Sequence, residues 1–369
     1  MKTILALFTG IFVPGGIQNY NRYFCMALGS QFSRNYFSVL SLCDKNKFSG
    51  LASNIHLKIY GNIKFKLLRK IVFSFDSILE VLKQRPTYVF CGHINLLPLT
   101  WFINRVFGLK YSVFVHGIEV WNLRSGNKYK YLKSADLIFA VSRYTKKRMV
   151  ENGISENKIF ILPDCVETAL FKPKDVNDKL LDYLDIKGKK VLLTVARLSA
   201  QERYKGHDVM LRVMQRLDEN YIWLIVGDGD DLIRLKQSAL AAGLAKRVKF
   251  LGGINDINLL VDYYNVCHCF IMPSSGEGFG IVFLEALACG KSVIAGNKDG
   301  SSEPLMDGRL GSLIDPENVE EIIKSINLAF NNGSLNVNKE FLIAEVKKNF
   351  GFESFSRRVK DLFSEILNR

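Results

Sequence analysis

The sequence predicts an α/β protein built from two open parallel sheets, each with helices on both faces. Short apolar runs alternate with segments of helical periodicity along nearly the whole chain, a pattern typical of parallel strands joined by helices. The 369 residues are enough for two domains of ordinary size. Apolar residues make up 48% of the chain, which excludes a disordered protein.

The first domain is expected over residues 1–168. Its strands are the apolar runs that end at glycine, proline or polar residues. The expected strands are Thr3–Phe8, Phe37–Leu42, Thr87–Cys91, Tyr111–His116, Leu137–Ser142 and Lys158–Leu162, with helices beginning near Gly16, Phe75, Asn95, Asn127 and Arg143. The prolines at 163 and 173 indicate a linker out of this domain.

The second domain is expected over residues 175–350 and repeats the alternation. Its expected strands are Lys190–Val195, Tyr221–Val226, Val248–Leu251, Cys269–Met272, Ser292–Ala295 and Gly311–Ile314. Helices are expected at about Asp208–Leu217, Asp230–Ala242, Asn258–Tyr264, Ile281–Ala288 and Glu317–Asn331. A last amphipathic helix is expected at about 352–369.

The most informative stretch is the glycine-rich turn between the strand at Cys269–Met272 and the helix that begins at Ile281. Three glycines, at 276, 278 and 280, form a turn that exposes backbone N–H groups at a helix N-terminus, where a phosphate can bind. Two carboxylates, Glu277 and Glu285, bracket the turn. Carboxylates around a phosphate site suit a ligand with hydroxyl groups at both ends, such as a nucleotide sugar.

Two cations in the second domain are candidates for binding a diphosphate. Breaking a bond between a sugar and a diphosphate leaves negative charge, which cations and helix N-termini can stabilise. Arg197 follows a strand and Lys205 precedes a helix. The loop between them is long enough to bring both to one site. Arg203 lies in the same loop, but we do not expect it to bind the diphosphate. The segment 228–230 has the letters of an Asp-x-Asp metal motif, but its position favours a turn and a helix cap, so we predict no metal.

Strand ends in the first domain supply further candidates. Gly15 and Gly16 close the first strand and precede a helix, so backbone there can approach a phosphate or an acceptor. His116 ends another expected strand, where its ring can hydrogen-bond a sugar hydroxyl or a phosphate oxygen. His93 and Glu119 are weaker candidates on the same grounds.

These residues resemble a known family. Glu277 and Glu285, with the Gly278-Phe279-Gly280 segment between them, are similar to the E-x7-E signature of the retaining GT-B glycosyltransferases of family 4, the group 1 glycosyltransferases. Arg197 and Lys205-Gly206 are similar to the "GRL" and "KG" elements of the same family, with Ala196 in place of the usual glycine. The resemblance implies two Rossmann-like domains that face each other across a deep cleft, the first binding the acceptor and the second the donor.

The resemblance also implies roles for individual residues. Glu285 would hold the ribose hydroxyls, and Glu277, with Phe279 and Gly280, the transferred sugar. Arg197, Lys205 and the N–H groups near Ile281 and Val282 would contact the phosphates, and Gly278 belongs to the same loop. The glycine loop at 15–16 would face the donor, and His116 would hydrogen-bond the sugar of the donor. Catalysis would retain the anomeric configuration through front-side attack and need neither a metal nor another cofactor. The family's usual Asn-Gly in the linker reads Asp164-Cys165 here, which leaves linker contacts with the donor open.

The net charge of +14 is unevenly distributed. Residues 1–174 contain 25 Lys and Arg against 9 Asp and Glu, a net charge of +16, whereas residues 175–369 contain 25 against 27, a net charge of −2. The two basic runs, at 64–73 and 143–148, suit an anionic membrane surface, although each taken alone fits a solvated helix face equally well. Nucleic acid is not an expected partner because the sequence has no recognition motif for it.

Cysteine usage and the absence of long apolar runs bear on location. The seven cysteines lie mostly in apolar surroundings, which favours reduced thiols in a cytosolic protein. The Cys267-His268-Cys269 segment is interpreted as core and not as a zinc site. The N-terminal apolar residues could begin a signal peptide, but a first strand fits better. We therefore expect a cytoplasmic protein, peripheral on the inner face of the cell membrane.

Together these observations predict a retaining glycosyltransferase that moves a hexose from a nucleotide diphosphate sugar, of the UDP-glucose type or GDP-mannose. The acceptor would be a glycan or a polyprenol-linked oligosaccharide in surface polysaccharide biosynthesis. Two alternatives remain: a GT-B-like nucleotide-sugar epimerase, and a non-catalytic basic module that binds membranes.

Overall fold

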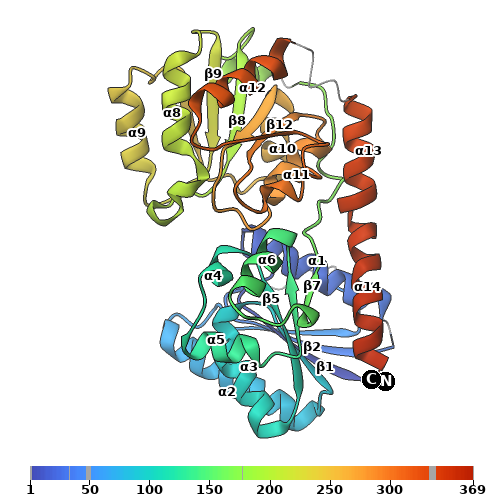
Figure 1. Ribbon diagram of the computed structural model, residues 1–369. Coiled ribbons are helices and arrows are strands. Elements are labelled where there is room, and N and C mark those ends of the chain that lie inside the picture. Colours follow the sequence, from blue (N-terminus) through green and yellow to red (C-terminus); the bar gives the residue numbers. More distant parts are fainter. Residues whose placement is uncertain (1, 33, 47–50, 177, 332–337, 369) are drawn as a thin grey trace. The chain divides into compact units, whose positions relative to one another are not determined.

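The computed structural model describes the chain except residues 1, 33, 47–50, 177, 332–337 and 369 (Figure 1). The chain divides into two compact units. The N-terminal unit contains Met1–Cys165 and Phe352–Arg369, and the C-terminal unit contains Val166–Gly351. The domain limits expected from the sequence, 168 and 175, lie within ten residues of this division.

The N-terminal unit is built on a seven-stranded parallel sheet in the order β3-β2-β1-β4-β5-β6-β7. Its strands are β1 (Thr3–Phe8), β2 (Tyr36–Ser41), β3 (Ile55–Ile59), β4 (Tyr88–Cys91), β5 (Lys110–Val115), β6 (Leu137–Ala140) and β7 (Ile159–Ile161). The central strands are buried on both faces, which explains why they read as continuous apolar runs instead of alternating ones.

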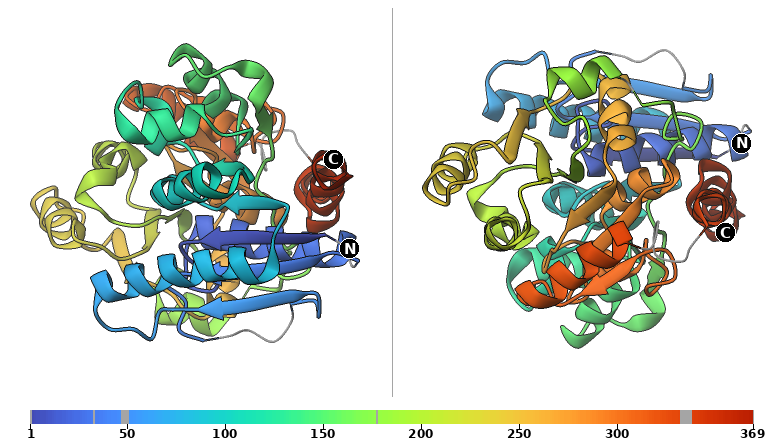
Figure 2. Two further views of the ribbon diagram at one scale, coloured as in Figure 1. Left: turned by 90° about the horizontal axis from the view of Figure 1, so that it is seen from below. Right: turned by 90° about the horizontal axis from the view of Figure 1, so that it is seen from above.

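Helices cover both faces of this sheet (Figure 2). They are α1 (Gly16–Gln31), α2 (Lys66–Gln84), α3 (Leu97–Phe107), α4 (Ile118–Trp121), α5 (Gly126–Lys133), α6 (Arg143–Glu151) and α14 (Phe352–Asn368), with short 3-10 turns at Ile94–Leu96 and Glu156–Lys158. α14 packs against α1. The Phe363 ring of α14 lies 5.3 Å from that of Phe24 and 4.9 Å from that of Phe90. The C-terminal helix is thus part of the N-terminal unit's core.

The C-terminal unit is built on a six-stranded parallel sheet in the order β10-β9-β8-β11-β12-β13. Its strands are β8 (Lys190–Val195), β9 (Tyr221–Val226), β10 (Val248–Gly252), β11 (Cys269–Met272), β12 (Ser292–Gly296) and β13 (Ser312–Ile314). Its helices are α7 (Asp178–Tyr183), α8 (His207–Arg216), α9 (Leu232–Ala241), α10 (Ile257–Val266), α11 (Ile281–Ala288), α12 (Val319–Asn331) and α13 (Lys339–Phe350), with 3-10 turns η3 (Ala200–Lys205) and η4 (Gly300–Ser302). Two parallel α/β sheets confirm the predicted fold class.

Five helices and strands differ from the sequence expectation. β3 was not predicted, because it is a half-exposed edge strand that carries a histidine and a lysine. α2 begins at Lys66 and not near Phe75, since its first two turns keep apolar residues at its surface. α4, α7 and α13 were also not predicted. α7 has only six residues, too short for a helical period to be recognised in the sequence.

The strand orders fix where ligands can bind. In each sheet the order reverses beside the first strand of its unit: between β1 and β4, and between β8 and β11. Open α/β sheets bind ligands beyond the carboxyl ends of the strands at such a switch point. These two edges are therefore where the candidate site residues are sought. No helix in the described part of the chain is long and apolar enough to span a membrane.

Candidate active site

The charged candidates of the C-terminal unit lie at its switch point. Arg197 follows the end of β8 by two residues, and Glu277 follows the end of neighbouring β11 by five. β8 and β11 pair directly, with Cys269 opposite Leu192 and Phe270 opposite Leu193. The sheet topology therefore places residues about 80 positions apart in the sequence at the same edge of the C-terminal sheet.

At this edge four charged side chains form one connected cluster. Lys205 Nζ donates to Glu277 Oε1 at 2.7 Å and lies 3.8 Å from Glu202 Oε2. Arg197 pairs with the other oxygen of Glu202. Lys205, Glu202 and Glu277 are each about 15% exposed, whereas Arg197 is 70% exposed. The structure thus brings together Arg197, Lys205 and Glu277, and it adds a second carboxylate between the two cations.

The loop that carries Lys205 is held against the glycine-rich turn by backbone contacts. Ser275 N donates to the carbonyl oxygen of Tyr204 at 2.9 Å. Gly206 has a φ of 83°, and a Cβ there would overlap the carbonyl oxygen of Pro273. A Cβ at Gly276 would overlap the Tyr204 ring. Glycine is therefore required at both positions for the approach that sets Lys205 beside Glu277.

Asp299, in the turn after β12, fixes the backbone of Glu277. Its carboxylate accepts from Glu277 N at 2.6 Å and from Ser301 N at 2.9 Å. Gly300 N donates to the carbonyl oxygen of Glu277 at 2.8 Å. Burial raises the pKa of Asp299 to about 6, although both backbone N–H groups act in the opposite direction. The glycine-rich turn is thus braced from both sides by hydrogen bonds.

The N-terminus of α11 follows this turn and can bind an anion. Gly280 is its N-cap, with a φ of 89°, and no side chain caps the helix there. The first N–H groups of a helix lack partners within the helix and carry partial positive charge. Ile281 and Val282 are half-buried at this end. This arrangement suits the phosphate contact predicted for Ile281 and Val282.

Two residues that are predicted to bind the nucleotide-sugar donor have buried side chains. The Phe279 side chain is buried, and its ring lies 5.9 Å from that of Phe350. A contact from Phe279 to a sugar would therefore involve its backbone. Glu285 is also buried, on α11, where it accepts from Tyr264 Oη at 2.7 Å. Burial raises the pKa of Glu285 to about 7, so its charge is sensitive to what binds beside it.

In the N-terminal unit, the glycine loop between β1 and α1 is organised by a buried carboxylate. Asp44 accepts from the backbone N–H groups of Ile11, Phe12 and Val13 at 2.7–2.9 Å. Gly15 is the N-cap of α1, with a φ of 147°, and Gly16 is the first residue of the helix. No side chain caps α1 at this end. Asp44 therefore fixes the backbone of this loop, and the contact predicted at Gly15 and Gly16 with a phosphate or an acceptor stays a prediction.

His116 and His93 lie together beyond the carboxyl ends of β5 and β4. Their rings are stacked, with centroids 6.2 Å apart, and the Tyr20 ring lies edge-on to His116 at 5.2 Å. Burial lowers the pKa of both histidines to about 4. Glu119 accepts from His116 N and so fixes the strand end. Both rings are neutral at pH 7, and His116 can offer a hydrogen bond but no charge.

The residues that the sequence analysis considered but did not assign to the site lie outside the Lys205 cluster or in the core. Arg203 faces Asp231 at 3.5 Å and does not join the Lys205 cluster. Asp230 accepts from Ala200 N at 2.9 Å, as expected of a turn residue. Cys267 and Cys269 are buried free thiols. Among the described residues no group of three or more histidine, cysteine or acidic side chains could hold a metal ion.

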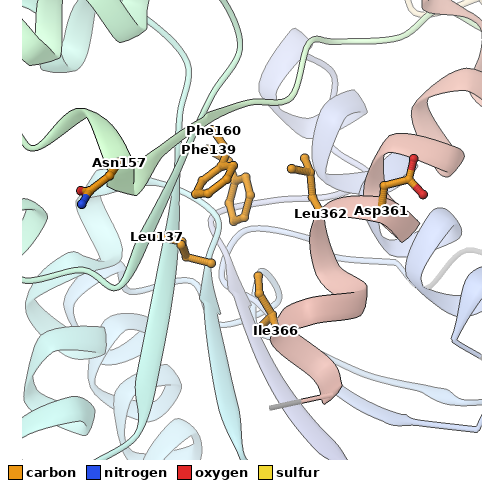
Figure 3. A pocket seen from close by; sticks show the side chains of 7 residues that line it. All are labelled: Leu137, Phe139, Asn157, Phe160, Asp361, Leu362 and Ile366. Atoms are coloured by element: carbon orange, nitrogen blue, oxygen red, sulfur yellow. The ribbon is translucent and has the colours of Figure 1, made fainter.

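A separate apolar cavity of about 320 Å³ lies within the N-terminal unit (Figure 3). It is lined by Leu137, Phe139, Asn157, Phe160, Asp361, Leu362 and Ile366. None of the predicted catalytic or donor residues is among them. Among the described residues that line it, the only charged side chain is Asp361, an acid that would repel a diphosphate. This cavity is therefore not a candidate for binding a nucleotide sugar.

The sequence analysis missed four residues of these two edges: Glu202, Asp299, Asp44 and Tyr264. Asp299 and Asp44 each follow a strand by three residues, so the strand-end argument applied to His116 would have found them. Glu202 stands between Arg197 and Lys205 in the sequence, and no role was predicted for it. Tyr264 gives no local signal, because its relation to Glu285 depends on how α10 and α11 pack.

Comparisons with known proteins agree with this geometry. The family model of the glycosyl transferases group 1 matches residues 178–341, which lie within the C-terminal unit. A GDP-mannose-dependent alpha-(1-6)-phosphatidylinositol monomannoside mannosyltransferase of Mycolicibacterium smegmatis is 31% identical over 232 residues, covering 57% of this chain and 58% of that protein. Across the first curated relatives the matched part spans between 48% and 60% of the relative's length.

Solved structures match over the whole chain. Sucrose-phosphate synthase from Thermosynechococcus elongatus superposes with a TM-score of 0.82 at 18% identity and covers 100% of both chains. Anabaena HepE in complex with UDP and glucose superposes with a TM-score of 0.79 at 17% identity, covering 99% of this chain and 100% of the other. These likenesses confirm the predicted GT-B fold. Residues 178–341, within the C-terminal unit, thus match the family model of the group 1 glycosyl transferases.

Proposed function

We propose that this chain is a retaining hexosyltransferase that uses a nucleotide diphosphate sugar and needs no metal ion. The observation that carries the proposal is the cluster of Arg197, Lys205 and Glu277 beside the uncapped N-terminus of α11. Two cations and a helix N-terminus at one switch point can neutralise a departing diphosphate. The solved complex of Anabaena HepE with UDP and glucose shows that a protein of this fold binds such ligands.

The reaction follows from these groups. The bond between the sugar C1 and the diphosphate oxygen breaks, and a bond from C1 to an acceptor hydroxyl oxygen forms on the same face. The acceptor proton passes to the departing phosphate, whose charge Arg197 and Lys205 stabilise. Glu277 and the backbone at Gly280 hold the sugar, and Glu285 holds the ribose. His116 of the N-terminal unit has a neutral ring, so its role in this proposal is hydrogen bonding and not charge stabilisation.

The acceptor in this proposal is a glycan or a lipid-linked oligosaccharide, used at the inner face of the cell membrane. The basic N-terminal unit supports it: residues 1–165 and 352–369 together hold 27 Lys and Arg against 11 Asp and Glu, a net charge of +16. The mannosyltransferase relative, by its name, acts on a phosphatidylinositol mannoside. Both point to a glycolipid or polysaccharide product.

Thermal unfolding in the presence of UDP-, GDP- and ADP-sugars tests the donor assignment, because a ligand that binds only the folded state raises the melting temperature. One nucleotide series should raise it, and Lys205→Ala should abolish that shift. Arg203→Ala is the matched control, since Arg203 faces Asp231 outside the cluster, and it should keep the shift. An undiminished shift in Lys205→Ala would overturn the phosphate assignment.

Product analysis separates transfer from epimerisation. A transferase releases the nucleoside diphosphate in step with glycosylated acceptor and retains the anomeric configuration. Release of an altered free sugar or nucleotide without any acceptor would favour the epimerase. Binding to membranes with no response to any nucleotide sugar would favour the non-catalytic module.

A further inference from the structure

Helix α2 has an exposed apolar stripe on the side opposite its buried face. Phe73, Ser77 and Val81 face the core. Leu67, Ile71 and Phe75 follow one another at four-residue spacing and are more than half exposed, so they lie on one side of the helix. With Phe65, just before the helix, the stripe forms an apolar surface that nothing in the described part of the chain covers.

Four cations border this stripe: Lys64, Lys66, Arg69 and Lys70. None of them takes part in the ion pairs found among the described residues. The second basic run behaves differently, because Lys146 pairs with Glu156 at 3.1 Å and Arg148 with Glu151 at 3.1 Å. The two runs looked equivalent in the sequence, but in the structure two cations of the second run pair with acids, whereas the four of the first lie beside exposed apolar side chains.

We propose that this surface of α2 binds an anionic lipid bilayer, with the apolar stripe among the acyl chains and the cations at the lipid headgroups. A helix with one apolar and one basic side lies in the plane of a membrane interface in this way. The inference deepens the proposed function, on which it rests for the lipid-linked acceptor. A symmetric pairing of two copies through α2 is disfavoured, because it would bring the same four cations of each copy together.

Vesicle sedimentation tests the inference. The full chain should bind phosphatidylglycerol–phosphatidylcholine vesicles and bind pure phosphatidylcholine at least tenfold less. Leu67→Ser/Ile71→Ser/Phe75→Ser and Lys64→Gln/Lys66→Gln/Lys70→Gln should each lower binding at least tenfold. Ile233→Ser/Leu240→Ser is the matched control for the first variant, since these α9 residues are 72% and 67% exposed, and Lys236→Gln/Lys246→Gln is the control for the second.

The outcomes separate this inference from the proposed function. Circular dichroism and the donor-induced rise in melting temperature should be unchanged in every variant. Equal vesicle binding by variants and controls would overturn the role of α2, as would a wild-type chain that binds donor but no vesicles. A dimer in analytical ultracentrifugation that the serine variant dissolves would identify a second copy as the occupant and also overturn it. Vesicle binding without any donor binding would overturn the transferase proposal and leave the role of α2 standing.

A second inference rests on a different observation, the position of Glu202. Its two carboxylate oxygens face Arg197 and Lys205, the cations assigned to the diphosphate. Glu202 also departs from helical geometry inside η3, with φ −117° and ψ 30°. A carboxylate on both cations has the charge and the two-oxygen geometry of a phosphate group.

We infer that Glu202 occupies the phosphate site in the free enzyme and must be displaced by the donor. It would then weaken the binding of nucleoside diphosphate and speed product release. Because this rests on the proposed diphosphate site, the probes are UDP, GDP and the matching nucleosides, measured by isothermal titration calorimetry.

Glu202→Gln should bind the recognised nucleoside diphosphate at least fivefold tighter, with no change for the nucleoside. Glu340→Gln, an exposed acid of the same unit, makes the same change in net charge and should leave both affinities unaltered. Glu202→Ala gives a second variant without the amide and should act in the same direction. Unchanged or weaker diphosphate binding in both Glu202 variants would overturn the competition, whereas a wild-type chain that binds neither diphosphate would overturn the proposed function.

Discussion

The two units present opposite electrostatics at equivalent edges of similar sheets. The N-terminal unit carries a net charge of +16, yet its switch point holds neutral histidines and a glycine loop fixed by buried Asp44. The C-terminal unit carries −2, yet its switch point holds Arg197 and Lys205. Net charge therefore does not locate a phosphate site. The strand ends do, and the excess charge of the N-terminal unit lies elsewhere, partly on α2.

The largest expected effect is on catalysis. It compares the charge at the edge of the C-terminal sheet with the hydrogen bonding at the edge of the N-terminal sheet as contributions to kcat. Lys205→Ala should lower kcat by about 10²–10³-fold, the usual cost of removing one preorganised donor to developing charge. His116→Gln, which keeps a hydrogen-bonding group, should lower kcat no more than about tenfold. Steady-state kinetics with the identified donor measure both, and thermal melts confirm folding. A larger loss in His116→Gln would place the main catalytic group in the N-terminal unit.

The next prediction compares the two buried aspartates that hold the loops. Asp44 accepts three backbone N–H groups and the Ser41 hydroxyl, whereas Asp299 accepts two backbone N–H groups. Asp44→Ala should lower the free energy of unfolding by about 3 kcal/mol and Asp299→Ala by about 2 kcal/mol, because each leaves buried donors unpaired. Urea denaturation gives both values. The reverse order would show that the loop of the C-terminal unit depends more on its carboxylate.

The pH dependence of stability should have opposite signs at the two edges. His116, with its pKa lowered to about 4, binds fewer protons in the folded state than in the unfolded state between about pH 4 and 6.5, so its contribution to stability is lost as the pH falls. Glu285, with its pKa raised to about 7 from 4.5, binds more protons when folded, so its contribution is lost as the pH rises from 4.5 to 7.

Single substitutions separate these contributions. His116→Gln should reduce the gain in stability from pH 4.5 to 6.5, and Glu285→Gln should remove a loss of order 2 kcal/mol between pH 4.5 and 7. His207 of the C-terminal unit, whose pKa burial also lowers to about 4, acts in the same direction as His116. The comparison is therefore made between each variant and the wild type across the pH range. Equal slopes in wild type and Glu285→Gln would mean that the pKa of Glu285 is the same in the folded and unfolded states.

The sequence predicted the C-terminal edge better than the N-terminal edge for a physical reason. Glu277, Gly280 and Glu285 lie in one continuous turn and helix, and Arg197 and Lys205 flank one loop, so local spacing was sufficient. Asp44 reaches its three N–H partners from more than 30 positions away, and Tyr264 meets Glu285 across two helices. Such contacts depend on tertiary packing. The edge strand β3 escaped prediction because its half-exposed residues lack the continuous apolar run of its neighbours.

The smallest expected effect sharpens the assignment within the C-terminal unit. Arg203 is two residues from Lys205 and carries the same charge, but it faces Asp231, 3.5 Å away and in turn paired with Arg234 at 2.6 Å. Arg203→Ala should therefore change kcat and KM less than threefold, because Arg203 lies outside the Lys205 cluster and Asp231 keeps its ion pair with Arg234. Arg197→Ala, by contrast, should raise the Kd for nucleoside diphosphate at least tenfold, since it removes a cation from the phosphate site. If the two arginine variants were equally impaired, the diphosphate would be attracted by the overall basic charge of this loop, and the specific pairing of Arg197 with Lys205 would not be needed.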